Sequence, residues 1–133
     1  MRISRLEIEI TEPEALLDIT KQVKAVVKAS GVENGVLFIF CPHTTAGILI
    51  QENTGADLVH DVLLALANAV PKDTAFQKAE ANSHAHVKAA IIGSSQVVPI
   101  EKGKLVLGAF QSVYLCEFAG PRSRQVLLKI IAD

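Results

Sequence analysis

The chain has 133 residues, half of them apolar and 20% charged, with a net charge of −1 when histidine is neutral. This length suits a single domain spanning residues 1–133 with a core of its own. The near-neutral charge argues against nucleic acid or an anionic membrane as a partner, and 5% aromatic residues without Trp argue against a base-stacking surface. Because no signal-peptide pattern and no apolar run of ~20 residues are present, we expect a cytoplasmic protein.

The first part of the chain predicts three strands and a helix. Apolar and charged residues alternate from 6 to 10, which is typical of a half-buried strand. Asp18 is placed to cap a helix that Gly31 ends, and its apolar face is made of Ile19, Val23, Val26 and Val27. Continuous apolar residues over 36–40 and 46–50 predict two further strands, joined by Pro42, His43, Thr44 and Thr45.

The remainder predicts one long helix, one short helix and more strands. Helical periodicity extends over 53–70, and the polar, irregular residues 72–85 predict a long loop of a kind that is often functional. A short helix follows over 87–92, and 101–104 carries a hairpin signal. Strand patterns complete the chain over 96–100, 105–110, 113–118 and 125–131. This segregation predicts an α+β fold with a mainly antiparallel sheet, two main helices and one short helix.

Four histidines lie near the junctions of these elements. His43 joins two predicted strands, His60 lies on the polar side of the long helix, and His84 and His86 end the long loop. A catalytic zinc site takes three protein ligands and leaves one position open, and neutral imidazole is the commonest ligand. Three of the four could form such a site. The alternative is that each is structural or exposed, since no His-Glu-x-x-His segment is present.

Two arginines form a second group of candidate binding residues. Arg122 and Arg124 are two residues apart in an extended segment, so both point to the same face. Paired guanidinium groups suit a phosphate or a carboxylate. The alternative is a solvated strand end, or salt bridges to Glu117. Glu117 itself is interpreted as an exposed side chain or, if buried, as a general base.

The two cysteines give little support to nucleophilic catalysis. Cys41 and Cys116 both lie in apolar, strand-like segments, and neither belongs to a Cys-x-x-Cys pair. Burial as free thiols is therefore the expected state of both. No Gly-x-Ser-x-Gly, Walker or Rossmann pattern is present either.

Seven short segments occur together in an order typical of one family: His43-Thr44-Thr45-Ala46, Gln51-Glu52-Asn53, His60-Asp61, Asn82 with His86-Val87-Lys88-Ala89, Gly93-Ser94-Ser95, Gly108 with Phe110-Gln111, and Glu117-Phe118 with Gly120-Pro121-Arg122 and Arg124. Over nearly its whole length the chain resembles the YjbQ-like family. Its members are often described as secondary thiamine-phosphate synthases. The resemblance implies a compact α+β domain that assembles as a homotrimer.

The resemblance also implies a set of site residues at the matching positions. It implies a divalent metal ion, zinc or, with a diphosphate substrate, magnesium, held by His43, His60 and His86. The implied catalytic side chains are Glu52, Asp61 and Glu117. Those implied to bind the substrate or an anion are Thr44, Thr45, Asn53, Asn82, Lys88, Gln111, Arg122 and Arg124. The chain departs from the family pattern at Phe110, where Trp is usual, and at Ala81, where Gly is common.

Three functions follow as expectations. The first is a synthase-type transferase, active weakly or as a side activity, that joins a pyrimidine methyl diphosphate to a thiazole phosphate. The usual enzyme for this reaction is a (β/α)₈ barrel of at least ~200 residues, so this chain would be a convergent case. The second is a metal-dependent hydrolase of a small phosphorylated or acidic metabolite, with Glu52 or Glu117 as proton acceptor. The third is a non-enzymatic trimeric module that binds an anion or a metal.

Overall fold

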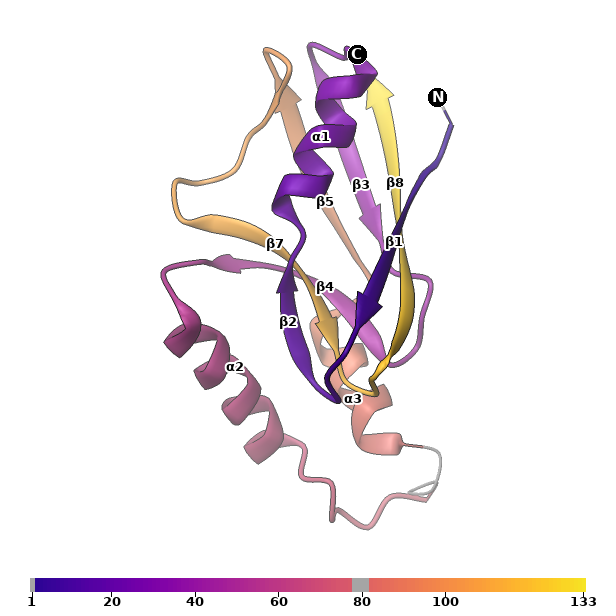
Figure 1. Cartoon of the computed structure of the whole chain (residues 1–133), viewed down its shortest axis with the longest axis vertical. Coiled ribbons are helices and arrows are strands. Elements are labelled where there is room, and N and C mark those ends of the chain that lie inside the picture. Colours follow the sequence, from indigo (N-terminus) through magenta and orange to yellow (C-terminus); the bar gives the residue numbers. More distant parts are fainter. Residues whose placement is uncertain (1, 78–81) are drawn as a thin grey trace.

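The computed structural model describes residues 2–77 and 82–133, so Ala81 lies outside the described residues. Within the described ranges the elements are β1 (Ser4–Ile10), β2 (Ala15–Asp18), α1 (Thr20–Ser30), β3 (Gly35–Phe40), β4 (Ala46–Glu52), α2 (Ala56–Ala69), α3 (Ser83–Ile92), β5 (Ser95–Glu101), β6 (Lys104–Leu105), β7 (Gln111–Glu117) and β8 (Arg122–Ala132). They build a large sheet in the order β1-β8-β3-β5-β6 and a small sheet in the order β2-β7-β4 (Figure 1). Neighbouring strands are antiparallel, so the predicted α+β class is confirmed.

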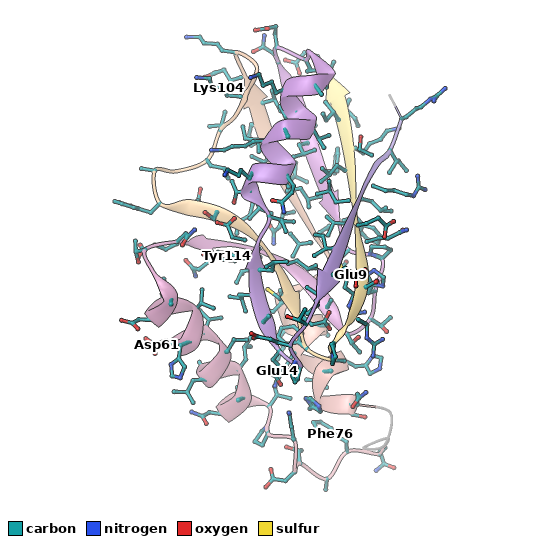
Figure 2. All side chains as sticks on the ribbon, viewed as in Figure 1. Glu9, Glu14, Asp61, Phe76, Lys104 and Tyr114 are labelled. Carbon is teal, nitrogen blue, oxygen red and sulfur yellow. The ribbon has the colours of Figure 1, made fainter. Side chains whose placement is uncertain are left out.

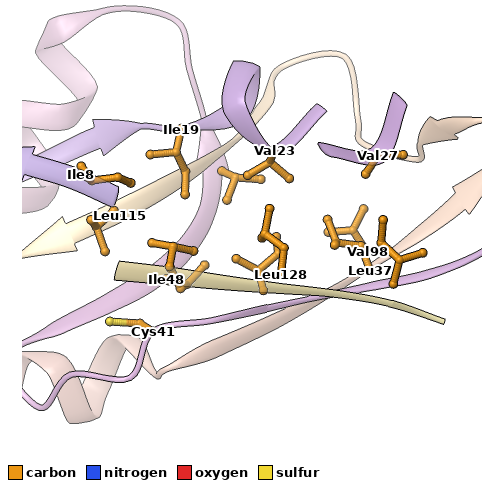
Figure 3. Close-up of a cluster of buried hydrophobic side chains, with 14 of the residues drawn as sticks. Ile8, Ile19, Val23, Val27, Leu37, Cys41, Ile48, Val98, Leu115 and Leu128 are labelled. Atoms are coloured by element: carbon orange, nitrogen blue, oxygen red, sulfur yellow. The ribbon is translucent and has the colours of Figure 1, made fainter. Parts of the chain in front are cut away.

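The main core lies between the large sheet and a layer made of the small sheet and α1 (Figures 1 and 3). Period-2 alternation supplies it, because every second side chain of a strand points to the same face. Burying each aliphatic side chain contributes roughly 1.5–3 kcal/mol. The fully or nearly fully buried members of the strands include Leu37, Ile39, Ile48, Val98, Val113, Leu115, Val126 and Leu128.

Helix α1 forms where the sequence predicts it. The Asp18 carboxylate accepts the backbone N–H of Thr20 at 2.9 Å, which satisfies one donor of the first turn. Gly31 ends the helix with a left-handed φ of 70°, a conformation that glycine adopts without steric cost. Its apolar face lies on the large sheet through Ile19, Val23 and Val27 (Figure 3).

The outer face of the small sheet carries a second core. Ala85 and Ala89 of α3 pack there against Tyr114, Cys116 and Phe118. Helix α3 can come this close because β4 has no side chain at Gly47, where a Cβ would lie 2.6 Å from the carbonyl oxygen of Gly93. In contrast, α2 has no buried residue within one chain and stands at the margin of the molecule (Figure 1).

The predicted starts of two helices, α2 and α3, differ from the structure. The long helix was predicted over 53–70 but begins at Ala56, because the chain stays extended to Glu52 in its pairing with β7. The Asn53 backbone N–H then bonds to the Phe110 carbonyl at 2.7 Å, which keeps the first residues of the prediction out of the helix. Helix α3 begins at Ser83, four residues before the predicted short helix.

Two strand predictions also need correction. A strand over 105–110 was predicted, but only Lys104–Leu105 pairs with β5. The chain turns before β7, where the Gln111 side chain accepts the backbone N–H of Gly108 at 2.8 Å. Strand β2 was missed, because four residues carry too little periodicity, and only its pairing with β7 makes it a strand. The hairpin at 101–104 is confirmed, with φ 53° at Lys102 and 78° at Gly103.

Candidate functional site

The segment between β3 and β4 carries the chain from the large sheet to the small one. Phe40 is the last β3 residue paired with β8, opposite Leu127, so Gln125 lies past the end of β3. The backbone N–H of Gln125 donates instead to His43 Nε2 at 3.0 Å. His43 is therefore held at the edge of the large sheet, and Thr45 follows at the start of the small one.

This hydrogen bond fixes the state of the His43 ring. Burial and, next, the positive charge of Arg124 lower the pKa of His43 from its ordinary value of 6.5, so the ring is neutral at pH 7. A neutral imidazole has one N–H, and Nε2 is here the acceptor. Nδ1 therefore carries the proton and is a hydrogen-bond donor.

Helix α3 brings a second histidine to the same place. His43, Thr44 and His86 line two adjoining hollows of about 350 and 380 Å³. We call the first of these the His43–His86 pocket; its wall is completed by Pro42, Thr45, Asn82, Arg122 and Arg124. The second hollow continues along α3 to Gly93. Volumes of this size suit a small ligand, and the first wall is rich in hydrogen-bond donors.

Arg124 forms the inner wall of the pocket. Period-2 alternation places it in the inward row of β8, and its side chain is buried at 3% exposure. Its Nε donates to Oε1 of Glu117 at 2.6 Å, and its Nη2 donates to Oε2 of Glu117 and to Thr45 Oγ1. Glu117 is fully buried and also accepts the backbone N–H of Ala119. This ion pair joins the two sheets where the apolar core ends.

Arg122 forms the outer edge of the pocket and is exposed. Its Nε donates to the carbonyl oxygen of Ala119 at 2.9 Å, which fixes the plane of the guanidinium. Among the described residues no other hydrogen bond or ion pair involves Arg122. Its two terminal amino groups are thus available to a ligand beside the imidazole rings, in the arrangement that suits an oxyanion.

Comparison with known proteins agrees with the resemblance seen in the sequence. Residues 4–133 match the family described as "UPF0047 protein YjbQ-like". The chain belongs to the YjbQ/UPF0047 family. It is 40% identical to the UPF0047 protein MJ1081 of Methanocaldococcus jannaschii, over 97% of this chain and 94% of that one, and 38% identical to YugU of Bacillus subtilis, over 97% and 98%. The names of these relatives state no activity.

Solved structures of the family share the fold. A crystal structure of an uncharacterized conserved YjbQ/UPF0047 protein from Clostridium acetobutylicum matches with a TM-score of 0.93 and 46% identity, over 96% of this chain and 99% of that one. A YbjQ-like protein of unknown function from Sulfolobus solfataricus matches with a TM-score of 0.95 and 30% identity, over 99% and 97%. The antiparallel α+β architecture is therefore that of the family.

The structure brings together only part of the predicted site. The predicted residues around the His43–His86 pocket are His43, Thr44, Thr45, Asn82, His86, Arg122 and Arg124. Glu117 contacts the pocket only through Arg124, because both of its oxygens are occupied by hydrogen bonds inside the protein. The salt bridge to Glu117, which the sequence left as an alternative for the arginines, is confirmed for Arg124. Glu117 is not placed as a general base in this arrangement.

A second group of predicted residues lies at the far end of β4. Glu52, Asn53 and Gln111 lie where β4 ends and β7 begins, a seven-residue strand away from the pocket, or about 20 Å. The Asn53 amide donates to Asp18 Oδ2 at 2.8 Å, and so ties this end of the small sheet to the start of α1. Phe110, which departs from the family pattern, is 65% exposed beside them.

His60, Asp61 and Lys88 lie elsewhere. His60 and Asp61 are on α2, and their side chains are 74% and 70% exposed, with His60 Nδ1 3.6 Å from an Asp61 oxygen. Figure 2 shows Asp61 on this outlying helix. Lys88 points from α3 into the second core, where its fully buried ammonium donates to Glu14 Oε1 at 2.9 Å. None of the three lines the His43–His86 pocket.

A three-histidine metal centre does not fit one chain in this arrangement. Across residues 2–77 and 82–133 no three His, Cys, Asp or Glu side chains are grouped so that they could hold an ion. His43 and His86 share the pocket, but Nε2 of His43 is already engaged by Gln125 and its Nδ1 carries a proton. Proton-bearing nitrogens do not bind metals. The donors that face the pocket therefore suit an anion better than a cation.

Both thiols are buried and unpaired by disulfide, as the sequence predicts. Burial raises the pKa of Cys41, and it raises the pKa of Cys116 to about 12. A thiol in this state is a poor nucleophile. Within the described residues no helix is long and apolar enough to cross a membrane.

Some residues that shape the pocket carry no signal in the sequence. The backbone N–H of Gln125 and the carbonyl oxygen of Ala119 orient His43 and Arg122, and backbone groups are the same whatever the residue type. Glu14, the partner of Lys88, is 74 residues away along the chain. Only a knowledge of which strands pair would have found these contacts.

Proposed function

We propose that the His43–His86 pocket binds the phosphate group of a small phosphorylated molecule. The observation that carries the proposal is Arg122, whose Nε is held by the Ala119 carbonyl while its terminal amino groups face the space lined by His43 and His86. A forked guanidinium beside imidazole and amide donors is the usual chemistry of phosphate recognition. The buried Arg124 lines the same space, but its charge is balanced by the ion pair with Glu117.

The activity that we propose for this pocket is a synthase-type transfer, as in the joining of a pyrimidine methyl diphosphate to a thiazole phosphate. In that reaction a diphosphate leaves, and its developing negative charge has to be stabilised in the transition state. Arg122 would donate to the leaving diphosphate, and the Nδ1–H of a neutral His43 would donate to one of its oxygens. Thr44 and Asn82 would orient the same group from the rim.

Hydrolysis by a metal-bound hydroxide is less well supported. It requires three ligands and a proton acceptor, whereas Glu117 is bound to Arg124 and Glu52 could reach the pocket only from a neighbouring copy. The proposal of a divalent ion is therefore kept in one form only, as magnesium that enters with a diphosphate substrate. In that form the ion's ligands are mainly the oxygens of the diphosphate.

We also propose that three copies of the chain assemble, as the resemblance implies. Support comes from surfaces that one chain leaves uncovered. Helix α2 has no buried residue, and the outer face of the large sheet exposes Phe38, Phe40, Val97 and Ile131 at 38–52%. Apolar surface of this kind marks contact sites between proteins.

The two ends of β4 suggest how such copies meet. If the Glu52–Asn53 end of one copy contacts the His43–His86 pocket of the next, the contact is head-to-tail, and a head-to-tail contact that closes forms a ring. The ring would unite the two separated groups of site residues and would cover an open pocket. Exclusion of water is needed for a reaction through a cationic intermediate.

Binding is tested with inorganic pyrophosphate and with thiazole phosphate, by isothermal titration calorimetry. We expect Arg122→Gln to weaken both ligands about tenfold, the loss expected for one charge-assisted contact, with an unchanged melting temperature. Gln125→Ala is the matched control, because only its backbone N–H contacts His43. Equal affinities in the wild type and Arg122→Gln would overturn the phosphate site.

Turnover is tested separately, with both substrates and magnesium present. Binding without product would reject the synthase and leave the anion-binding module. The ring is tested by light scattering and by mixing His86→Ala with Asn53→Ala, each inactive alone. In random mixed trimers about a quarter of the contacts combine two intact ends, so about a quarter of the activity should return. A monomer, or no recovery on mixing, would contradict the ring while leaving the pocket in place.

A further inference from the structure

A second cavity, of about 470 Å³, lies between α1 and the β5–β6 hairpin. Figure 1 places these elements at the end of the molecule remote from α3 and the His43–His86 pocket, and Figure 2 shows Lys104 there. Lys24 and Lys28 of the helix and Lys102 and Lys104 of the hairpin line the cavity. We call it the lysine cleft.

Helix and hairpin geometry explain why the four lysines converge. Lys24 and Lys28 are one helical turn apart and lie on the same side of α1 as Val27, which faces the core at 2% exposure. The hairpin folds its turn over this side of the helix, so that Lys102 and Lys104 stand across the cleft. Val27 and Leu105 give the cleft an apolar floor.

The four lysines of the cleft have carboxylates nearby but no ion-pair partner among the described residues. Across residues 2–77 and 82–133 none of the four lysines forms an ion pair or a side-chain hydrogen bond. Two carboxylates lie at the turn, Glu101 opposite Lys104 and Glu33, whose backbone carbonyl accepts the Gly103 N–H at 2.9 Å, and neither forms an ion pair with the lysines. Like charges one helical turn apart are destabilising, and two more across the cleft add to the repulsion.

The hairpin turn itself gives no reason for a lysine at position 102. Lys102 has a φ of 53°, a left-handed conformation in which Asn, Asp or Gly is preferred. A side chain with a Cβ and a long stem is disfavoured there. The backbone conformation therefore does not account for a lysine at this position.

We propose that the lysine cleft binds a small molecule carrying two or three linked phosphate groups. Ammonium groups bind phosphates as point charges from several directions, and four of them match the charge of a linear oligophosphate better than that of a single phosphate. The volume falls within the range of small-ligand sites. Among residues 2–77 and 82–133 no aromatic side chain lines the cleft, which disfavours stacking of nucleic acid bases. This site is independent of the function proposed for the His43–His86 pocket.

The test is calorimetric titration of the full chain with tripolyphosphate and with ATP, at low and at physiological salt. The helix side is removed with Lys24→Gln/Lys28→Gln and the hairpin side with Lys102→Asn/Lys104→Gln, since Asn tolerates the left-handed backbone. Lys21→Gln/Arg5→Gln is the matched control, because it removes two exposed charges outside the cleft. Thermal melts confirm that each variant is folded.

Each double variant should weaken tripolyphosphate about tenfold, as expected for two partly exposed ion pairs, while the control changes affinity less than twofold. Equal affinity for ATP and tripolyphosphate would show that the phosphates alone are recognised. Tighter binding of ATP would show that the apolar floor of the cleft also contacts the ligand. The proposal is overturned if the control weakens binding as much as the cleft variants do. It is also overturned if Arg122→Gln alone abolishes binding, because the probe then occupies the other pocket.

Discussion

Arg122 and Arg124 belong to two very different regions, although they are separated by one residue and point to the same side of β8. Arg124 lies at the end of the apolar core, opposite Ile8, and its Nε and Nη2 donate to Glu117 and Thr45. Arg122 lies two residues nearer the start of β8, opposite Ile10, and its own side chain is exposed. Position along the strand, and not the face of the sheet alone, therefore decides whether an arginine is buried in an ion pair or left exposed.

The largest expected effect tests the buried side of this comparison. Glu117→Leu would leave the Arg124 guanidinium buried without a counter-charge, and should lower the free energy of unfolding by roughly 3–5 kcal/mol. Urea denaturation followed by circular dichroism measures it. The double variant Glu117→Leu/Arg124→Met should regain most of the loss, because no unpaired charge remains. A single variant that costs less than about 1 kcal/mol would show that Arg124 is not tightly held.

The second ion pair extends the comparison to the other core. Lys88 is 1% exposed at its side chain, whereas Glu14 is 19% exposed and also lies 3.9 Å from Lys72. Removing the Glu14 carboxylate leaves the buried Lys88 ammonium without a counter-charge. Removing the Lys88 ammonium leaves a Glu14 carboxylate that water can reach. Glu14→Gln should therefore cost about 2 kcal/mol and more than Lys88→Met does. Equal costs in urea denaturation would contradict this asymmetry.

The role of the exposed Arg122 is tested by a substitution that keeps its positive charge. Arg122→Lys removes the forked donor and the Nε contact with the Ala119 carbonyl. We expect pyrophosphate affinity to fall several-fold, between the wild type and Arg122→Gln, while the free energy of unfolding stays within about 0.5 kcal/mol. If lysine restores full affinity, charge alone is recognised and the orientation of the guanidinium is irrelevant.

The smallest expected effect concerns the imidazole of His43, which lines the pocket together with both arginines. The pKa of His43 is lowered in the folded protein, so below 6.5 the unfolded chain binds more protons than the folded one. Stability should therefore fall as the pH decreases from 6.5 towards the folded-state pKa, and then level off. His43→Gln, which keeps an acceptor for Gln125, should flatten this slope in urea titrations made with a chelator.

His84 provides the control for that measurement. Its pKa is also lowered, mainly by burial and then by Lys88, so His84→Gln should remove a separate part of the slope. Unchanged slopes in both variants would show that the two rings titrate as they do in the unfolded chain.

Much of the fold could be predicted because alternation and capping are local. The strand at 36–40 and the helix between Asp18 and Gly31 follow from such patterns and are confirmed. The end of β4 was not predictable, since Asn53 stays out of α2 through a bond to Phe110, 57 residues later. For the same reason the sequence could not tell Arg122 from Arg124, because Glu117 lies on β7 in the other sheet, and the packing of the two sheets decides which arginine reaches it.

For the candidate site, the sequence predicted some of the residues that are involved but not how their side chains are arranged. The segment at His43 and the segment at His86 meet as the family resemblance implies, because Gly47 allows α3 to approach β4. The family resemblance implied Lys88 beside them, but Lys88 is two residues beyond His86 on α3 and points into the second core. The direction in which each α3 side chain points depends on how the helix is rotated against its packing partner, and the sequence alone does not give that rotation.

The short crossing from Phe40 to Ala46 ties the two sheets together at the very place where a ligand would sit. His43 is hydrogen-bonded to Gln125 of the large sheet, while His86 belongs to α3, which packs against the small sheet. Any substitution that lets the layers slide, even at Leu37 or Val113 deep inside the molecule, would change the gap between the imidazoles. Selection for tight interior packing and selection for ligand recognition would then both act on the relative position of the two sheets.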